Sequence, residues 1–131
     1  MKKLSLITFM LSLITVAGCS TKHYLTNGEL IYQEGKNLSG DKLLDKRNSS
    51  ISFIRSCRGC HGSDGKRLRY AIISWSGLTD PGRKTTPYTD SLFFRFIDRD
   101  LKSDGSQVKT GVHWRMSSQD KEDLITFLKS L

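Results

Sequence analysis

The sequence predicts an all-α fold, and three observations support this prediction. Two segments in the second half of the chain carry apolar residues at helical spacing, and each follows a residue that can cap a helix. A motif of two cysteines and a histidine indicates a third helical turn, because its cysteines are three positions apart. No segment shows the alternation of apolar and polar residues that is typical of a half-buried strand.

A first helix is expected near residue 28. Asn27 can act as its N-cap, and we expect the helix to run through Tyr32 and to stop near Gly35. The next residues, 36–48, are polar and indicate a loop.

A second helix is expected to lead into the cysteine motif. Ser49 or Ser50 can cap this helix, and Ile51 and Ile54 would share one of its faces. The helix should then continue through the motif and end at Gly62.

The second half of the chain begins with residues 63–88, which contain both prolines and are expected to be irregular. A helix over residues 90–101 follows, with Thr89 as its N-cap. Its apolar stripe consists of Leu92, Phe93, Phe96 and Ile97, and the residues expected to face away are Arg95, Asp98 and Arg99.

The last expected helix starts after Ser117. Ser117 and Asp120 stand at the spacing of a capping box, with Asp in place of the usual Glu or Gln. The expected buried face repeats at intervals of three and four residues and consists of Leu124, Phe127, Leu128 and Leu131.

The motif at residues 57–61 has the form C-x-x-C-H, which attaches a c-type haem. Cys57 and Cys60 lie on one helical turn, so each can form a thioether to a haem vinyl group. His61 is then held under the porphyrin, where its imidazole can bind iron as the proximal ligand. The sequence therefore predicts one covalently bound haem c.

Three other kinds of site use similar residues. Zinc needs four ligands, usually from two Cys or His pairs, and the only cysteine outside the motif is Cys19. A disulfide or a thioredoxin-like redox pair needs no histidine after the second cysteine, and a redox pair normally follows a strand. These alternatives are less favoured than haem.

The N-terminus has the features of an export signal. Residues 1–3 are basic, and residues 4–16 form an apolar stretch too short to span a bilayer comfortably. The run that ends at Cys19, Val-Ala-Gly-Cys, resembles the lipobox of bacterial lipoproteins, in which the cysteine is acylated after cleavage. The alternative is an ordinary signal peptide with Cys19 near its cleavage site.

These features predict three parts of the chain: a signal peptide at residues 1–18, a lipid-anchored tether at 19–27 and one domain at 28–131. The mature protein would lie outside the inner membrane, facing the periplasm or the outer cell surface, with the choice of membrane left open. Loss of two lysines with the signal lowers the formal net charge from +8 to +6. An exported, anchored protein has no ready access to nucleic acid, so acidic redox proteins or anionic lipid are the expected partners.

From Gly28 to Leu131 the chain resembles the class I c-type cytochromes. In this family a glycine on the first helix allows close crossing by the last helix, and an aromatic residue four positions later packs there; Gly28 and Tyr32 have this spacing. The run CRGCHGSDG and the C-terminal run DLITFL also resemble family sequences. The resemblance implies the cytochrome c fold, a few helices around one covalent haem.

The resemblance also implies a methionine as the distal iron ligand. Met116 is the only methionine left after the signal peptide is removed, and it precedes the last helix, where family members carry this ligand. His113 is the competing candidate, whereas His23 lies in the tether. Family members commonly use a proline carbonyl to orient the proximal histidine, but the residues before Gly77 contain no such proline.

With His61 and Met116 both bound, iron would have no open position for a small-molecule substrate. The predicted function is therefore one-electron transfer by a membrane-tethered carrier, not an enzyme. The alternatives are a fixed haem subunit of a larger dehydrogenase or oxidase and, less favoured, a gas or peroxide sensor or enzyme. The cations near the motif, which could steer an acidic partner, are Arg55, Arg58, Lys66, Arg67 and Arg69.

Overall fold

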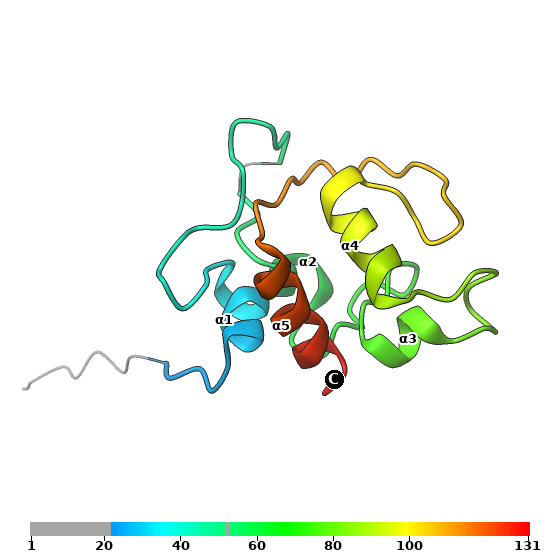
Figure 1. Cartoon of the computed structure of the whole chain (residues 1–131), viewed down its shortest axis with the longest axis horizontal. Coiled ribbons are helices and arrows are strands. Elements are labelled where there is room, and N and C mark those ends of the chain that lie inside the picture. Colours follow the sequence, from blue (N-terminus) through cyan, green and yellow to red (C-terminus); the bar gives the residue numbers. More distant parts are fainter. Residues whose placement is uncertain (1–21, 52) are drawn as a thin grey trace, which may run out of the picture.

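A computed structural model describes residues 22–51 and 53–131 of the chain (Figure 1). The predicted signal peptide at residues 1–18 and the predicted acylation site, Cys19, lie outside the described residues. Of the predicted tether at 19–27, only its last part is described.

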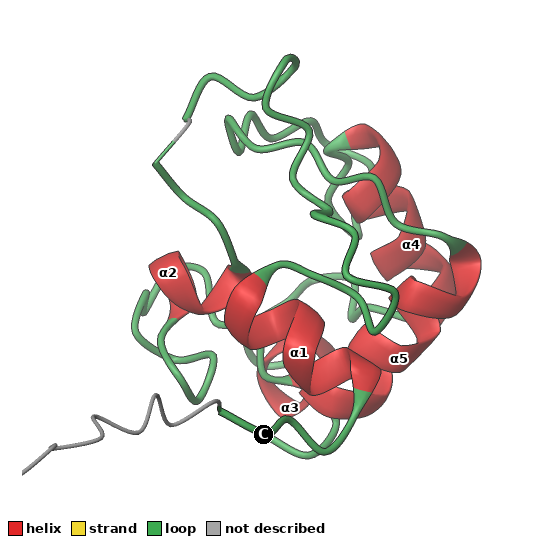
Figure 2. Cartoon of the chain, turned by 90° about the vertical axis from the view of Figure 1, so that its left-hand side faces the viewer, coloured by secondary structure: helices red, strands yellow, loops and turns green. Residues whose placement is uncertain are grey.

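The prediction of an all-α fold is confirmed for the described residues. They contain five helices and, apart from three isolated antiparallel bridges, no extended pairing (Figure 2). The helices are α1 (Asn27–Glu34), α2 (Cys57–His61), α3 (Trp75–Thr79), α4 (Asp90–Arg99) and α5 (Ser118–Leu128).

Helices α1 and α5 cross in direct contact, as the Gly28–Tyr32 spacing suggests. A Cβ atom on Gly28 would lie 2.0 Å from the backbone oxygen of Asp123 and 3.0 Å from the Cβ of Phe127. One turn later the rings of Tyr32 and Phe127 pack with their centroids 5.2 Å apart. The crossing therefore needs a residue without a side chain at position 28.

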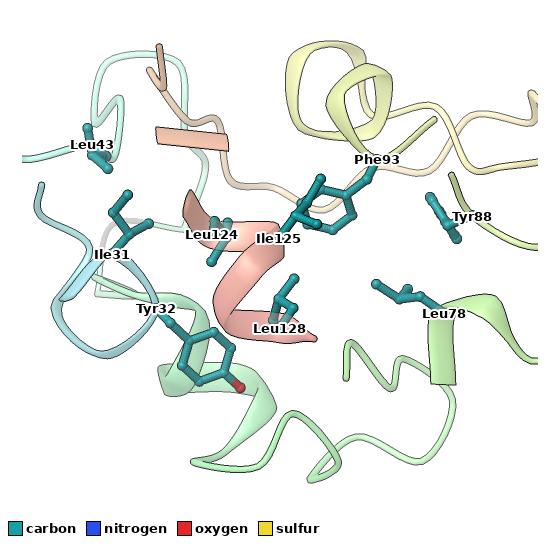
Figure 3. Packing of buried hydrophobic residues seen from close by; sticks show 9 residues of the cluster. All are labelled: Ile31, Tyr32, Leu43, Leu78, Tyr88, Phe93, Leu124, Ile125 and Leu128. Atoms are coloured by element: carbon teal, nitrogen blue, oxygen red, sulfur yellow. The ribbon is translucent and has the colours of Figure 1, made fainter. Parts of the chain in front are cut away.

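Helix α5 lies at the centre of the hydrophobic core (Figure 3). Its buried residues separate a cluster on α1 and the loop after it from a cluster on α3, α4 and the segment between them. Because one helix contacts both clusters, the two halves of the chain share a single core. The nine buried members of this core are Ile31, Tyr32, Leu43, Leu78, Tyr88, Phe93, Leu124, Ile125 and Leu128.

The N-cap of α1 is Thr26, so the prediction of Asn27 is wrong by one position. The Thr26 hydroxyl accepts a hydrogen bond from the backbone N–H of Glu29 at 3.1 Å. Asn27 is used in another way, because its side-chain amide donates to the carboxylates of Asp120 and Asp123 on α5. A residue suited to capping thus joins the two crossing helices instead.

The prediction of a helix starting at Ser49 or Ser50 is also wrong. The backbone N–H groups of Ser50 and Ile51 donate to the carbonyl of Gly111, at 3.0 and 3.1 Å. These donors are tied to a distant segment and do not begin a helix, and residues 53–56 are not helical either. The helix begins only at Cys57, and Gly62, the residue at which the helix was expected to end, is its C-cap.

The second half of the chain follows the predictions with two corrections. The segment 63–88 contains the short helix α3, whose Gly77 is required because a Cβ there would lie 2.4 Å from the Ile72 side chain. Arg95 does not face away from the fold, since it donates to the backbone oxygens of Lys102 and Ser103 at 2.8 and 3.1 Å.

The remaining caps agree with the sequence. Thr89 caps α4 by accepting from the N–H of Leu92, although the helix ends at Arg99, two residues before the expected end. Ser117 and Asp120 form the predicted capping box at the start of α5. This box fixes where the chain turns into the central helix of the core.

Replacement of Gly28 by alanine tests the close helix crossing. We expect Gly28→Ala to lower the free energy of unfolding by about 3 kcal/mol, because its methyl group would overlap a backbone oxygen that cannot move alone. Denaturant titration followed by circular dichroism measures this change. Gly59→Ala is the control, since a Cβ at this helical glycine meets its nearest neighbour at 3.8 Å. Equal stability of the two variants would contradict the account of the crossing.

Candidate functional site

Helix α2 is a single turn that carries Cys57, Cys60 and His61. The two cysteines lie at positions i and i+3, so they are neighbours on one side of the turn. No disulfide joins these two cysteines in the structure, and both side chains are half-buried, so the disulfide alternative is not favoured. Gly62 ends the helix with a φ of 78°.

His61 is oriented by a backbone carbonyl that the sequence analysis did not identify. The ring Nδ1 of His61 lies 2.9 Å from the carbonyl oxygen of Ala71. A carbonyl can only accept, so Nδ1 carries the proton and Nε2 keeps its lone pair. Burial lowers the pKa of His61, although the bond to Ala71 opposes this effect. The side chain is therefore held as the neutral tautomer that binds a metal through Nε2.

A closed loop holds the Ala71 carbonyl in place. The backbone N–H of Arg67 donates to the His61 carbonyl at 3.0 Å, and the backbone N–H of Ala71 donates to the Leu68 carbonyl at 2.9 Å. At the start of the loop, the buried hydroxyl of Tyr32 donates to the Gly62 carbonyl at 2.6 Å. Any residue type can supply a carbonyl at position 71, so no sequence motif marks it.

The surroundings of Cys57 do not suit a redox-active thiol. The side chain packs against the hydrophobic core, and this burial raises the pKa of the Cys57 thiol to about 12. Reactive cysteines in C-x-x-C oxidoreductases have a lowered pKa, because the thiolate is the nucleophile. The thioredoxin-like interpretation is therefore not favoured.

The described residues contain no group of three or more His, Cys, Asp or Glu side chains arranged to hold a metal ion. A haem iron does not depend on such a group, because the porphyrin supplies four of its ligands and the protein one or two. A neutral histidine that follows two cysteines on one helical turn fits this requirement.

Met116 lies at the end of an extended segment that pairs with the loop after α1. Leu44 and Trp114 form an antiparallel bridge. On either side of this bridge, the backbone N–H of Arg115 donates to the Leu43 carbonyl at 2.7 Å, and the backbone N–H of Asp45 donates to the His113 carbonyl at 2.8 Å.

The extended conformation separates Met116 from His113. Side chains alternate between the two faces of an extended chain, so residues 114 and 116 share one face while 113 and 115 share the other. Trp114 and Met116 are half-buried and pack against the hydrophobic core, which Cys57 also contacts. His113 and Arg115 are exposed. His23, the remaining histidine, is exposed ahead of α1.

An ion pair that sequence patterns did not reveal secures this segment. The Arg115 guanidinium contacts the Asp45 carboxylate at 2.7 Å. Its hydrogen bond holds the pKa of Asp45 well below the usual range, helped by bonds from the Asn48 side chain and the Arg47 backbone. Residues 45 and 115 are 70 positions apart, and neither belongs to a recognisable motif.

Most of the cations noted near the motif are on the surface. Arg55, Lys66, Arg67 and Arg69 are exposed, and Arg58 is half-buried. Arg67 also donates to the backbone oxygen of Gly59 at 3.0 Å, so it supports α2 as well as adding charge.

Comparison of the chain with protein-family models, with curated proteins and with solved structures finds no match. Among residues 22–51 and 53–131, no helix has the length and apolar character needed to cross a bilayer.

The Asp45–Arg115 pair predicts a dependence of stability on pH. Because the folded-state pKa of Asp45 is below its ordinary value of 3.8, the unfolded chain takes up a proton first as the pH falls. The stabilisation should be complete above about pH 5 and should be lost progressively below pH 4.

The variant Asp45→Asn should reduce the slope of unfolding free energy against pH between pH 5 and 3, relative to the parent protein. Denaturant titrations at a series of pH values measure both slopes. Identical slopes in the parent protein and Asp45→Asn would contradict the proposed strength of this pair.

Proposed function

We propose that this chain is a class I c-type cytochrome that acts as a membrane-tethered electron carrier. Haem c, when bound, supplies an iron that gains and loses one electron. The observation that carries the proposal is the 2.9 Å contact between His61 Nδ1 and the Ala71 carbonyl, directly after a C-x-x-C turn. A metal-binding histidine typically donates its other ring N–H to a carbonyl in this way, which fixes its tautomer and ring orientation.

The cysteines in this proposal anchor the porphyrin by thioether bonds. Cys57 and Cys60 stand on the turn that ends in His61, so covalent attachment at two points would fix the ring relative to the imidazole. The high pKa of Cys57 and its place against the core suit a sulfur that serves as an apolar link. The closed loop through Ala71 then limits rotation of the imidazole.

Met116 is proposed as the distal iron ligand. Two supports act on it: the paired extended segment holds residues 113–115, and the capping box fixes Ser117. His113 is on the opposite face of the segment and is exposed, which favours the thioether over a second imidazole. A ligand held from both sides would keep the sixth position closed and favour electron transfer over substrate binding.

We further propose that Cys19 is acylated and that the domain faces the periplasm or the outer cell surface. The residues between this cysteine and Asn27 would form a short tether. The exposed cations around α2 then favour encounter with an acidic redox partner, which would approach the face that carries the haem motif.

Replacement of Met116 tests the closed-site proposal. Met116→Ala should abolish the sulfur-to-iron charge-transfer band of the ferric protein and lower the reduction potential. It should also allow the ferrous protein to bind carbon monoxide. Absorption spectra and a redox titration measure these changes. His113→Ala is the control and should leave the band and the potential nearly unchanged. Survival of the band in Met116→Ala, or its loss in His113→Ala, would place the distal ligand elsewhere.

A further inference from the structure

A cationic cavity lies beside the loop that orients His61. Its volume is about 210 Å³, and its walls come from that loop, from α3 and from the segment after α3. We propose that this cavity binds a phosphate group. Six residues line the cavity: Arg69, Tyr70, Ile72, Gly77, Arg83 and Lys84.

The charge of the lining carries the proposal. Three of the six residues are cations, and none is an acid. The neighbouring carboxylate of Asp80 contacts Arg83, but at 3.8 Å and with both side chains about half exposed, so it neutralises little. Lys84, unlike the other two cations, is half-buried. A bound anion would balance the positive charge of this lining.

The arrangement of these cations favours phosphate over a carboxylate. Arg69 lies on the loop before α3, while Arg83 and Lys84 lie on the segment after it, so the cationic residues of the lining come from two separate segments. A tetrahedral phosphate presents oxygens in several directions, whereas a carboxylate presents two oxygens in one plane.

The cavity also adjoins the backbone segment that contacts His61. Tyr70 and Ile72 line it, and the residue between them is Ala71, whose carbonyl accepts from His61. A bound phosphate would add negative charge near the proximal ligand, which stabilises the oxidised centre and lowers the reduction potential. This coupling rests on the proposed function, whereas phosphate binding itself does not.

Titration of the purified mature protein with inorganic phosphate tests the site. At constant ionic strength, calorimetry should show saturable binding of one phosphate per chain. A variant with both Arg83→Gln and Lys84→Gln should bind at least about ten-fold more weakly, since two charge-assisted contacts are removed. Lys109→Gln, which removes an exposed cation outside the cavity, is the control and should bind like the parent protein.

A second probe, the soluble phosphodiester glycerophosphoglycerol, distinguishes a free phosphate ion from the phosphate of a lipid headgroup. Tighter binding of inorganic phosphate supports a free oxyanion, and tighter binding of the diester supports a lipid headgroup. The inference is overturned if neither probe binds saturably, or if Lys109→Gln weakens binding as much as the double variant does. Circular dichroism checks the fold, and the single variants replace the double variant if it unfolds.

The two proposals can fail separately. Phosphate binding by a protein without haem contradicts only the proposed function. A haem-bearing protein that does not bind phosphate contradicts only this inference.

Discussion

The crossing of α1 and α5 at Gly28 is the constraint on which the candidate site depends. Tyr32, one turn after the crossing, donates to the Gly62 carbonyl and so holds the residue that follows His61. At the other end, α5 begins at its Ser117 cap, the residue that follows Met116. Each proposed axial ligand is therefore followed in the chain by a residue that α1 or α5 holds in place. A shift in the crossing of these two helices would move both ligands.

A charged contact joins α4 to this helix pair. The Lys121 ammonium donates to both carboxylate oxygens of Asp98 at 2.8 Å and lies 5.1 Å from the Phe94 ring centroid. Its side chain is only 8% exposed, so removal of the Asp98 charge alone would leave a buried cation without its partner. The pair fixes how α4 packs on α5 more than it adds net stability.

The sequence predicted the helices that have their own local signals. The stripe over 90–101 placed α4 within two residues, and the capping box at Ser117 placed the start of α5. It failed for residues 49–56, where local capping signals are overridden by hydrogen bonds from Ser50 and Ile51 to the distant Gly111. It also missed α3, because a glycine inside a five-residue helix hides the pattern.

The candidate site, like the helices, was predictable only where a local pattern marks its residues. The C-x-x-C-H run names its residues directly, because the chemistry of attachment requires fixed side chains at fixed spacing. The Ala71 carbonyl and the Asp45–Arg115 pair had no such signal. A carbonyl is common to all residues, and an ion pair between distant positions exists only after the chain has folded.

The proposed electron transfer depends most directly on covalent attachment of haem to α2. The mature protein, purified from a host that exports and assembles c-type cytochromes, should keep its haem after acid–acetone extraction. Mass spectrometry should then find the group on the peptide that contains Cys57 and Cys60. Complete extraction of the haem, or alkylation of both cysteines as free thiols in the exported protein, would contradict the account.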